Sequence, residues 1–361
     1  MAKHHRFATL DGLRGVAALA VATGHLEASF EGAPLQHYGM AVDFFFVLSG
    51  FVLAHAYFDK LQGALTPRAF MRRRLIRMYP LYIFGTLLFA IYAGARVTLL
   101  HDFPLSMAGY AVMLLCAGLF LPTLIQHPER PDLYPLNAPA WSLLFELLAN
   151  VAFALSIRRL TVRMLLAVVA IGFIAQGILA LHYGSFSMGW NRATFFGGLA
   201  RVTFSFFSGV LVYRLWQRRP FRWNISPLLL IAALLAVMAV PTGAGLRVPY
   251  EVTASLAFPV LVYLGASSMP RPALRTPFLE AGAMSYALYT IHAPIIMICS
   301  SISAKLLGAD LPTFAPWGGI VLIVFMVILA ATLNRVYDGP VRRYLTKWTA
   351  NRTERLQALR P

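Results

Sequence analysis

The sequence predicts an all-α protein that crosses a membrane several times, and three observations carry that prediction. Hydrophobic residues make up 59% of the 361 residues and charged residues only 12%, whereas soluble domains carry roughly 25% charged residues. The mean hydropathy is +0.67. Apolar stretches of about 17 to 25 residues, the length that a helix needs to cross a bilayer, recur along the chain.

Eleven apolar segments are candidate spans, and Arg, Pro or Gly ends each of them. They cover residues 8–30, 38–58, 79–100, 104–126, 140–157, 164–182, 194–216, 225–241, 250–267, 278–300 and 316–338. The first segment is interrupted by Arg14 and His25 and shows no cleavage site, so we expect a retained helix rather than a signal peptide. No stretch is long and polar enough for a second folded domain. We therefore expect one membrane domain over 1–340 and a basic cytoplasmic tail over 341–361.

The basic residues set the expected topology, because loops rich in Lys and Arg stay on the cytoplasmic side. If the N-terminus is cytoplasmic, the arginine-rich stretch 60–77 is also cytoplasmic after two crossings. If segment 104–126 also spans, sixteen later basic residues fall on the outer side. We therefore predict about ten spanning helices, both termini in the cytoplasm, and a non-spanning or re-entrant segment within 101–139. Eleven spans are the alternative.

Charge, cysteines and motifs exclude several other classes of protein. The net charge is +17, but the basic residues separate apolar segments, which is typical of membrane proteins rather than nucleic-acid binders. Cys116 and Cys299 lie far apart in apolar segments, so neither a disulfide framework nor a cysteine metal site is indicated. The HExxH motif and glycine-rich phosphate loops are absent. We expect no metal and no nucleic-acid partner.

Ionisable residues inside apolar segments indicate a functional site, because burying them in a membrane is costly. Arg14 and His25 share one helix face, about 16 Å apart along the axis. We expect His25 near the outer side, at the depth where Asp43 and Glu146 should also lie. An imidazole accepts a proton near neutral pH, and a neighbouring carboxylate orients it. The sequence therefore predicts His25 as a general base oriented by Asp43 or Glu146; a structural histidine between helices is the alternative.

A cluster of arginines is expected at the cytoplasmic mouth of the third helix. Arg73, Arg74 and Arg77 lie within five residues of one another. Planar guanidinium groups suit phosphate, and several together suit a nucleotide-bearing ligand. The alternative is that they only fix the topology and contact anionic lipid head groups.

Two further places combine polar side chains with apolar surroundings. The stretch "GAMSYALYTIHAP", residues 282–294, puts serine, tyrosine and histidine side chains into one span, which is typical of a cavity lining. Arg201, inside its helix, needs a buried partner such as Glu146 or Glu251, or an anionic substrate. The candidate substrate-lining residues are Tyr286, Tyr289, His292 and Arg201.

Six stretches together resemble the acyltransferase-3 family of integral-membrane O-acyltransferases. They are "TLDGLRGVAALAVATGH", "VDFFFVLSGFVL", "RRRLIRMYPLY", "WSLLFELLAN", "GAMSYALYTIHAP" and "YDGPVRRYLTK". They run nearly end to end and in the family's order. The resemblance implies a ten-helix core and a cytoplasmic acyl-CoA donor, most often acetyl-CoA. The short C-terminal remainder predicts a member without the SGNH-type domain that many relatives carry.

The family's functional residues carry over at three motifs. Arg14 and His25 fall on the family's Arg-x10-His pair, which implies that His25 is the catalytic residue. Glu146 falls on the acid of the WSL motif, although one acid stands here where the family commonly has two. The RRxxR element falls on Arg73, Arg74 and Arg77.

These observations predict an O-acyltransferase of the bacterial inner membrane. Acyl-CoA would bind its phosphates to the arginines and extend along an Arg14-lined channel to His25, which would deprotonate a hydroxyl of a carbohydrate or small acceptor. An acyl-histidine intermediate is also open. The alternatives are a lipid or oligosaccharide flippase, a secondary transporter that uses the same charges, and a silent scaffold. The acceptor, the acyl length and the oligomeric state are left open.

Overall fold

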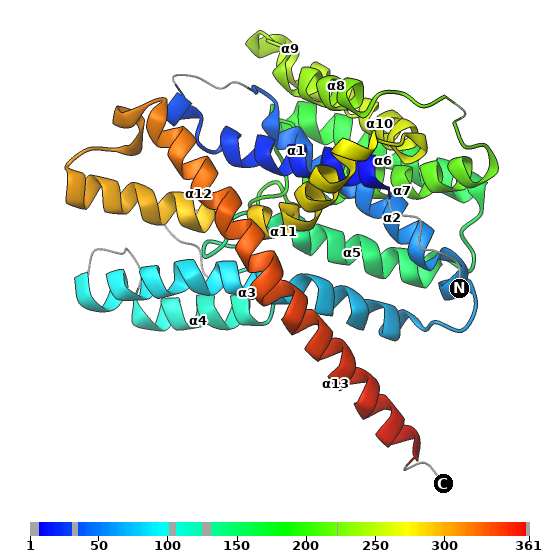
Figure 1. Ribbon diagram of the computed structural model, residues 1–361, viewed down its shortest axis with the longest axis horizontal. Coiled ribbons are helices and arrows are strands. Elements are labelled where there is room, and N and C mark those ends of the chain that lie inside the picture. The colour runs from blue at the N-terminus through cyan, green and yellow to red at the C-terminus, as the bar shows by residue number, and fades with distance from the viewer. Residues whose placement is uncertain (1–6, 31–34, 101–105, 125–130, 222, 359–361) are drawn as a thin grey trace.

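The protein is a bundle of helices, as predicted (Figure 1). The computed structural model describes residues 7–30, 35–100, 106–124, 131–221 and 223–358. Within these ranges the only β-type pairing outside the helices is one bridge between Asp132 and Asn191. Some predicted features lie outside the described residues, namely 101–105 and 125–130 of the non-spanning segment, Arg222, and 359–361 of the tail.

Thirteen α-helices make up most of the described chain. They are α1 (Ala8–Gly24), α2 (Ala41–Gln62), α3 (Pro67–Ala95), α4 (Met107–Gly118), α5 (Ala140–Ser156), α6 (Val162–Tyr183), α7 (Phe195–Arg218), α8 (Pro227–Ala239), α9 (Ala244–Ala254), α10 (Ala257–Ser267), α11 (Pro272–Ile302), α12 (Trp317–Leu333) and α13 (Gly339–Ala358). Each of the eleven predicted segments therefore overlaps at least one helix.

Seven helical stretches in the described residues are long and apolar enough to cross a membrane. They are Tyr38–Gln62, Pro67–Thr98, Val162–Tyr183, Phe195–Arg218, Gly245–Ser267, Pro272–Leu307 and Trp317–Ala350. The chain is thus a multi-pass membrane protein, while ten spans and cytoplasmic termini stay predictions. Helix α4 has only 12 residues, so it is about 18 Å long, short of the roughly 30 Å hydrocarbon core. Helix α8, in a predicted span, is almost as short with 13 residues, and the non-spanning segment stays a prediction.

The segment that precedes α5 is irregular and buried. Leu133, Tyr134, Leu136 and Asn137 are each at most 3% exposed. Irregular backbone at membrane depth is tolerated where protein surrounds it. Because this segment runs inside the bundle, α5 begins in the protein interior rather than at the outer surface.

Two pairs of parallel helices position the polar residues. Helices α1 and α11 run in the same direction. Arg14 of α1 donates to the Gly282 carbonyl of α11 at 2.6 Å, and farther along both helices the ring of His25 meets the ring of His292. Helices α2 and α7 also run parallel and touch backbone to backbone. A Cβ atom built on Gly209 of α7 would lie 2.0 Å from the Val47 carbonyl oxygen.

Replacing Gly209 with alanine should therefore destabilise the protein. Alanine gains at most about 1 kcal/mol of helix propensity over glycine, but a clash with fixed backbone costs about 1–3 kcal/mol or more. We expect a lower Tm for Gly209→Ala in detergent. Gly177 of α6 is the matched control, because its added Cβ would have Val252 at an ordinary 3.6 Å. Equal or higher Tm for Gly209→Ala than for Gly177→Ala would contradict this close packing.

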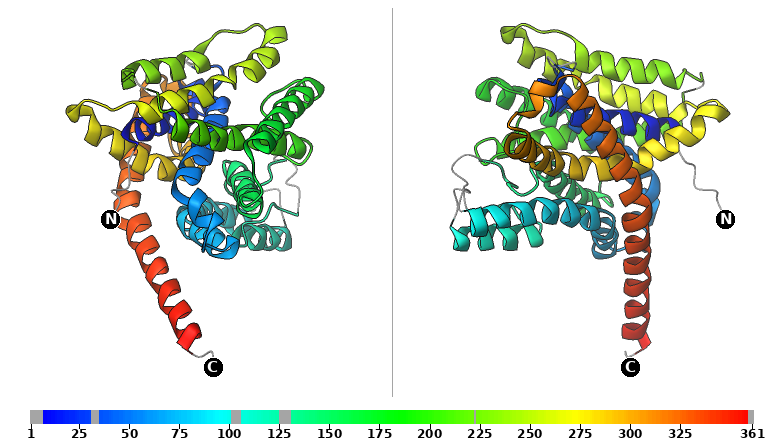
Figure 2. Two further views of the ribbon diagram at one scale, coloured as in Figure 1. Left: turned by 90° about the vertical axis from the view of Figure 1, so that its right-hand side faces the viewer. Right: turned by 60° about the vertical axis from the view of Figure 1, so that its left-hand side comes forward.

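The C-terminal helix α13 continues α12 through one π-helical stretch, Asn334–Asp338. It leaves the bundle and projects away from it in every view (Figures 1 and 2). The predicted boundary between the membrane domain and the tail, at residues 340 and 341, therefore falls inside one helix.

Candidate functional site

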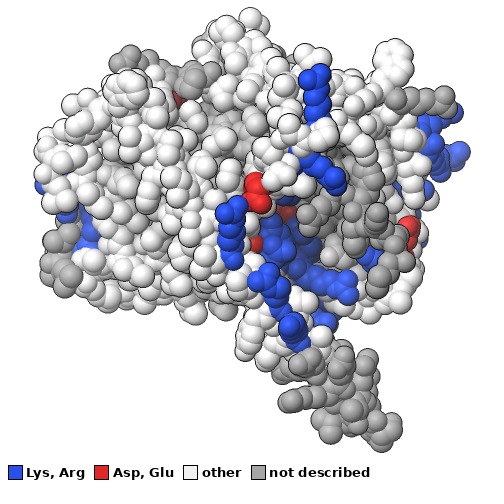
Figure 3. Space-filling model, viewed as in Figure 1, with Lys and Arg blue, Asp and Glu red and all other residues white. Residues whose placement is uncertain are grey.

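A large cavity opens between α2, α3, α5, α11 and the first half of α13. Its volume is about 970 Å³, which is in the range of ligand sites. Eight basic residues and a single acid, Glu146, are among its described lining residues, and Lys and Arg side chains gather beside the base of α13 (Figure 3). The basic residues are Arg14, Arg72, Arg73, Arg74, Arg77, Arg342, Arg343 and Lys347.

Glu146 lies in this cavity, and its carboxylate is bound to α3 and α2. Arg74 donates to Glu146 Oε1 at 2.7 Å, and the Ser49 hydroxyl donates to the same oxygen at 2.7 Å. The prediction that Glu146 lies near the outer side beside His25 is therefore wrong. The buried segment before α5 explains the error, because it starts this helix deep in the bundle.

A second buried acid organises the mouth of the cavity. Asp338, the last residue of the π-helical stretch between α12 and α13, accepts from Arg77 Nη1 at 3.1 Å and from Arg342 Nη1 at 3.0 Å. The Arg77 guanidinium also lies 5.1 Å from the centre of the Tyr286 ring, and the Tyr286 hydroxyl donates to the Met78 carbonyl. These contacts tie α3, α11 and α13 together and leave further guanidinium N–H groups to face the cavity.

Three basic residues of the lining have no acidic partner among the described residues: Arg73, Arg343 and Lys347. All three are exposed. Like charges around one cavity repel each other, so an anion between them is stabilised. Arg74 and Arg77, which the sequence placed with Arg73, are already engaged by acids and contribute only their remaining donors.

The inner end of the cavity is neutral and partly aromatic. Phe45, Ser142, Ser285, Tyr286 and Tyr289 line it. The Tyr289 and Ser142 hydroxyls are hydrogen-bonded at 2.7 Å. This end can therefore accommodate an uncharged group of a ligand, while the basic residues at the mouth can bind a negatively charged group.

His25 caps the C-terminal end of α1, and its side chain is exposed. Its Nδ1 lies 2.8 Å from the Val21 carbonyl oxygen. A carbonyl only accepts hydrogen bonds, so Nδ1 carries the proton and Nε2 of the neutral ring is left as a proton acceptor. A backbone carbonyl thus fixes the tautomer, and the predicted orienting carboxylate is not present at Nδ1.

His292 faces His25 from α11, with ring centroids 5.0 Å apart. Its Nδ1 donates to the Tyr289 carbonyl at 2.8 Å, and its buried Nε2 has no hydrogen-bond partner among the described residues. The His292 ring lies 5.7 Å from the ring of Tyr289, which lines the cavity. Neither histidine is among the lining residues, so Tyr289 separates the cavity from the histidine pair.

Asp43 and Arg201 form a buried ion pair elsewhere. Their side chains are 0% and 2% exposed, and Arg201 Nη2 donates to Asp43 Oδ2 at 2.7 Å. Arg201 also donates to the Met188 and Gly39 carbonyls. The prediction that Asp43 orients His25 is therefore wrong. The expectation that Arg201 pairs with Glu146 or Glu251 is also wrong, because its partner is Asp43. Arg201 is not among the lining residues of the cavity.

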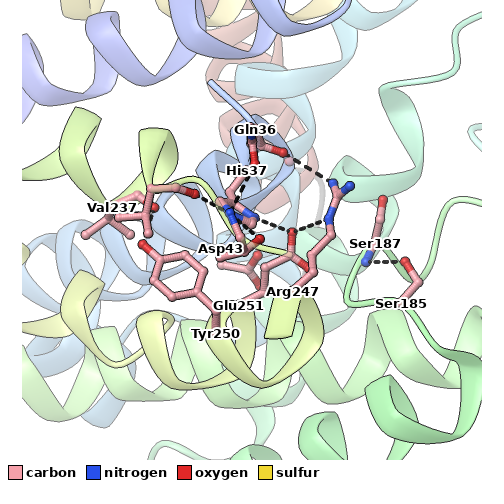
Figure 4. A network of polar contacts seen from close by, with 12 residues as sticks. Gln36, His37, Asp43, Ser185, Ser187, Val237, Arg247, Tyr250 and Glu251 are labelled. Atoms are coloured by element: carbon pink, nitrogen blue, oxygen red, sulfur yellow. Dashed lines mark hydrogen bonds and ion pairs between the residues drawn. The ribbon is translucent and has the colours of Figure 1, made fainter. Parts of the chain in front are cut away.

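Glu251, the other acid considered for Arg201, belongs to a separate network (Figure 4). It accepts from Arg247 at 3.3 Å, and one of its oxygens lies 2.8 Å from Nδ1 of His37. Nε2 of His37 lies 3.0 Å from the Val240 carbonyl oxygen. This network ties the segment before α2 to α9 and the end of α8.

Sequence reasoning missed the residues of α13 and Asp338. Their signal was present in "YDGPVRRYLTK": an acid at the end of an apolar segment, followed at helical spacing by two arginines and a lysine. Within the described ranges, no group of three or more His, Cys, Asp or Glu side chains is placed to hold a metal ion.

Comparison with known proteins identifies a matching family model and two similar proteins. Residues 7–335 match the family model described as "Acyltransferase domain". The chain is 28% identical over 375 residues to "Acyltransferase MdmB" of Streptomyces mycarofaciens, covering 94% of this chain and 92% of the relative. It is 38% identical over 186 residues to "Protein 2 in picA locus" of Rhizobium radiobacter, covering 49% of this chain and 96% of the relative. No solved structure matches.

Proposed function

The chain belongs to the acyltransferase-3 family, and on that premise we propose that it moves an acyl group, in the first place acetyl, from cytoplasmic acyl-CoA to a hydroxyl of a carbohydrate, lipid-linked or small-molecule acceptor. The proposed location is the bacterial inner membrane. Family membership favours acyl transfer over the flippase or transporter that the sequence alone left open.

The cavity between α3 and α13 is the observation that carries this proposal. Acyl-CoA combines several phosphate groups at one end with a small uncharged acyl thioester at the other. The cavity has the same polarity, with unpaired cations at its mouth and Ser142 and Tyr289 at its inner end. Arg14 also lines it, bound to Asp11 at 2.9 Å. The donor would bind with its phosphates at the mouth and its acyl group inside.

His25 is the proposed general base. Its Nε2 would take the proton of the acceptor hydroxyl as the oxygen forms a bond to the thioester carbonyl carbon. The carbon–sulfur bond then breaks, and the coenzyme A thiolate leaves with the proton that the imidazolium returns. The fixed Nδ1 proton supports this role, because it keeps Nε2 in the accepting form. An acyl-histidine intermediate at the same nitrogen is the mechanistic alternative.

One movement is required for this reaction. Tyr289 lines the inner end of the cavity, the His292 ring contacts the Tyr289 ring, and the His25 ring contacts the His292 ring. Among the described residues, the cavity that begins at the arginines therefore stops short of His25 and does not form the predicted continuous channel. We propose that the Tyr289 side chain shifts when the donor and acceptor bind.

Acceptor-dependent release of free coenzyme A tests the proposed function. The purified protein, in nanodiscs, receives acetyl-CoA together with a panel of hydroxylated sugars, lipid-linked sugars and small molecules. We expect thiol release that requires one class of acceptor, with a mass increase of one acetyl group on it. Transport of an acceptor without thiol release would overturn the proposal.

Arg73 should affect donor binding selectively. Because it has no acidic partner and lines the mouth, Arg73→Gln should raise the KM for acetyl-CoA about 10-fold, the size of one charge-assisted hydrogen bond, and leave kcat nearly unchanged. Arg68, exposed on the same helix and outside the lining, is the matched control. An unchanged KM for Arg73→Gln would contradict donor binding at this mouth.

A further inference from the structure

Helix α13 presents one face to the cavity. The lining residues that it contributes are Gly339, Arg342, Arg343, Thr346, Lys347, Thr349 and Ala350. At about 100° per residue they fall within one half of the helix circumference and extend over about 16 Å of its length. The helix begins at Gly339, beyond residue 335, where the match to the family model ends.

The two sides of α13 differ in chemistry. Arg343 and Lys347 lie one turn apart on the cavity side, and no acidic partner for either is found among the described residues. Like charges at this spacing destabilise a helix unless an anion lies between them. Tyr344 and Trp348, which are 67% and 50% exposed, lie on the opposite side, where aromatic residues suit a membrane interface. The cations therefore point to the cavity while the aromatic side faces away from it.

Coenzyme A carries phosphate groups at two different distances from its thioester. The diphosphate lies between the pantetheine arm and the ribose, and the 3′-phosphate lies on the ribose, at the end farthest from the thioester. Arg77 of α3 lies over the Tyr286 ring next to the neutral inner end, and it shares Asp338 with Arg342 at the start of α13. Because α13 projects away from the bundle beyond that point (Figure 1), its cations Arg343 and Lys347 are left for the outermost phosphate. We propose that Arg343 and Lys347 bind the 3′-phosphate of the coenzyme A donor. This inference rests on the proposed function.

Comparing coenzyme A with 3′-dephospho-coenzyme A tests this assignment, since the two ligands differ only in that phosphate. Binding is measured by calorimetry on the full chain in nanodiscs of phosphatidylcholine. We expect wild type to bind coenzyme A about 10-fold more tightly than the dephospho form. The double variant Arg343→Gln/Lys347→Gln should lose that preference, because its affinity for coenzyme A falls and its affinity for the dephospho form stays within about two-fold.

A matched control removes two charges elsewhere. Arg218 and Arg219, exposed at the end of α7 and outside the cavity lining, should change neither affinity when both are replaced by glutamine. An equal loss for both ligands in the α13 variant, or no loss for either, would overturn the 3′-phosphate assignment while leaving the donor site in place. Failure of wild type to bind either ligand would overturn the proposed function and this inference together.

A lipid phosphate is the other source of the same chemistry. The second arm measures co-sedimentation of wild type and the α13 variant, both in detergent, with phosphatidylglycerol vesicles. Equal co-sedimentation of the two proteins is expected. Loss of vesicle binding in the variant, together with an unchanged ratio of the two coenzyme affinities, would show that the cations recognise lipid and would overturn the proposal.

Discussion

Replacing His25 with glutamine should reduce acyl transfer by about 100-fold to 10,000-fold, the usual contribution of a general base. Glutamine keeps a hydrogen-bonding side chain at the end of α1 but cannot accept the proton. The donor cavity does not include His25, so the affinity for coenzyme A should stay within about two-fold of wild type. Steady-state turnover and calorimetry on the same preparation measure both quantities.

His182 provides the control for this experiment. It is an exposed histidine in the last turn of α6, so His182→Gln should leave turnover unchanged. Turnover of His25→Gln within a few-fold of wild type would remove His25 from the reaction. Loss of coenzyme A binding in that variant would instead place His25 in the donor site.

Replacing Arg201 with methionine should destabilise the protein by about 3–5 kcal/mol, because it leaves the Asp43 carboxylate buried without its counter-charge. The matched double variant Asp43→Leu/Arg201→Met removes both charges. It should recover much of the loss, since a buried ion pair can often be exchanged for apolar residues at little cost. Recovery should be partial because Arg201 also binds the Met188 and Gly39 carbonyls.

Unfolding free energies of the wild type, both single variants and the double variant form a cycle that measures the coupling of the pair. Neither residue of the pair is among the lining residues of the cavity, so a structural role predicts that stability changes while the substrate KM does not. If Arg201→Met has normal stability and a raised KM for the acceptor, the structural role is wrong. Arg201 would then bind an anionic substrate, the alternative that the sequence left open.

Sequence reasoning identified the helical membrane fold because long apolar segments leave little alternative. Arg14 and His25 could also be related in advance, since both lie on one helix with fixed rise and rotation. The pairing of residues on different helices could not be derived in the same way. Asp43 was expected beside His25 from depth alone, but depth does not determine which neighbouring helix a side chain faces.

Glu146 shows why the membrane depth of a residue can be inferred wrongly from the sequence. Counting from the start of its apolar segment places it near the outer surface, and that count assumes that the helix begins at the membrane boundary. The buried irregular segment ending at Asn137 breaks this assumption, so Glu146 lies with Arg74. The same limit applies to α13, whose basic residues look like a solvated tail until the direction of the preceding helix is known.

A cryo-electron microscopy structure of the protein in nanodiscs with a non-hydrolysable acetyl-CoA analogue tests the central claim most directly. The account predicts phosphate density within hydrogen-bond distance of Arg73 and the α13 cations, and the acetyl group at the Tyr289 end with Nε2 of His25 facing it. Donor density outside the cavity between α3 and α13, or an acetyl group that points away from His25, would contradict it.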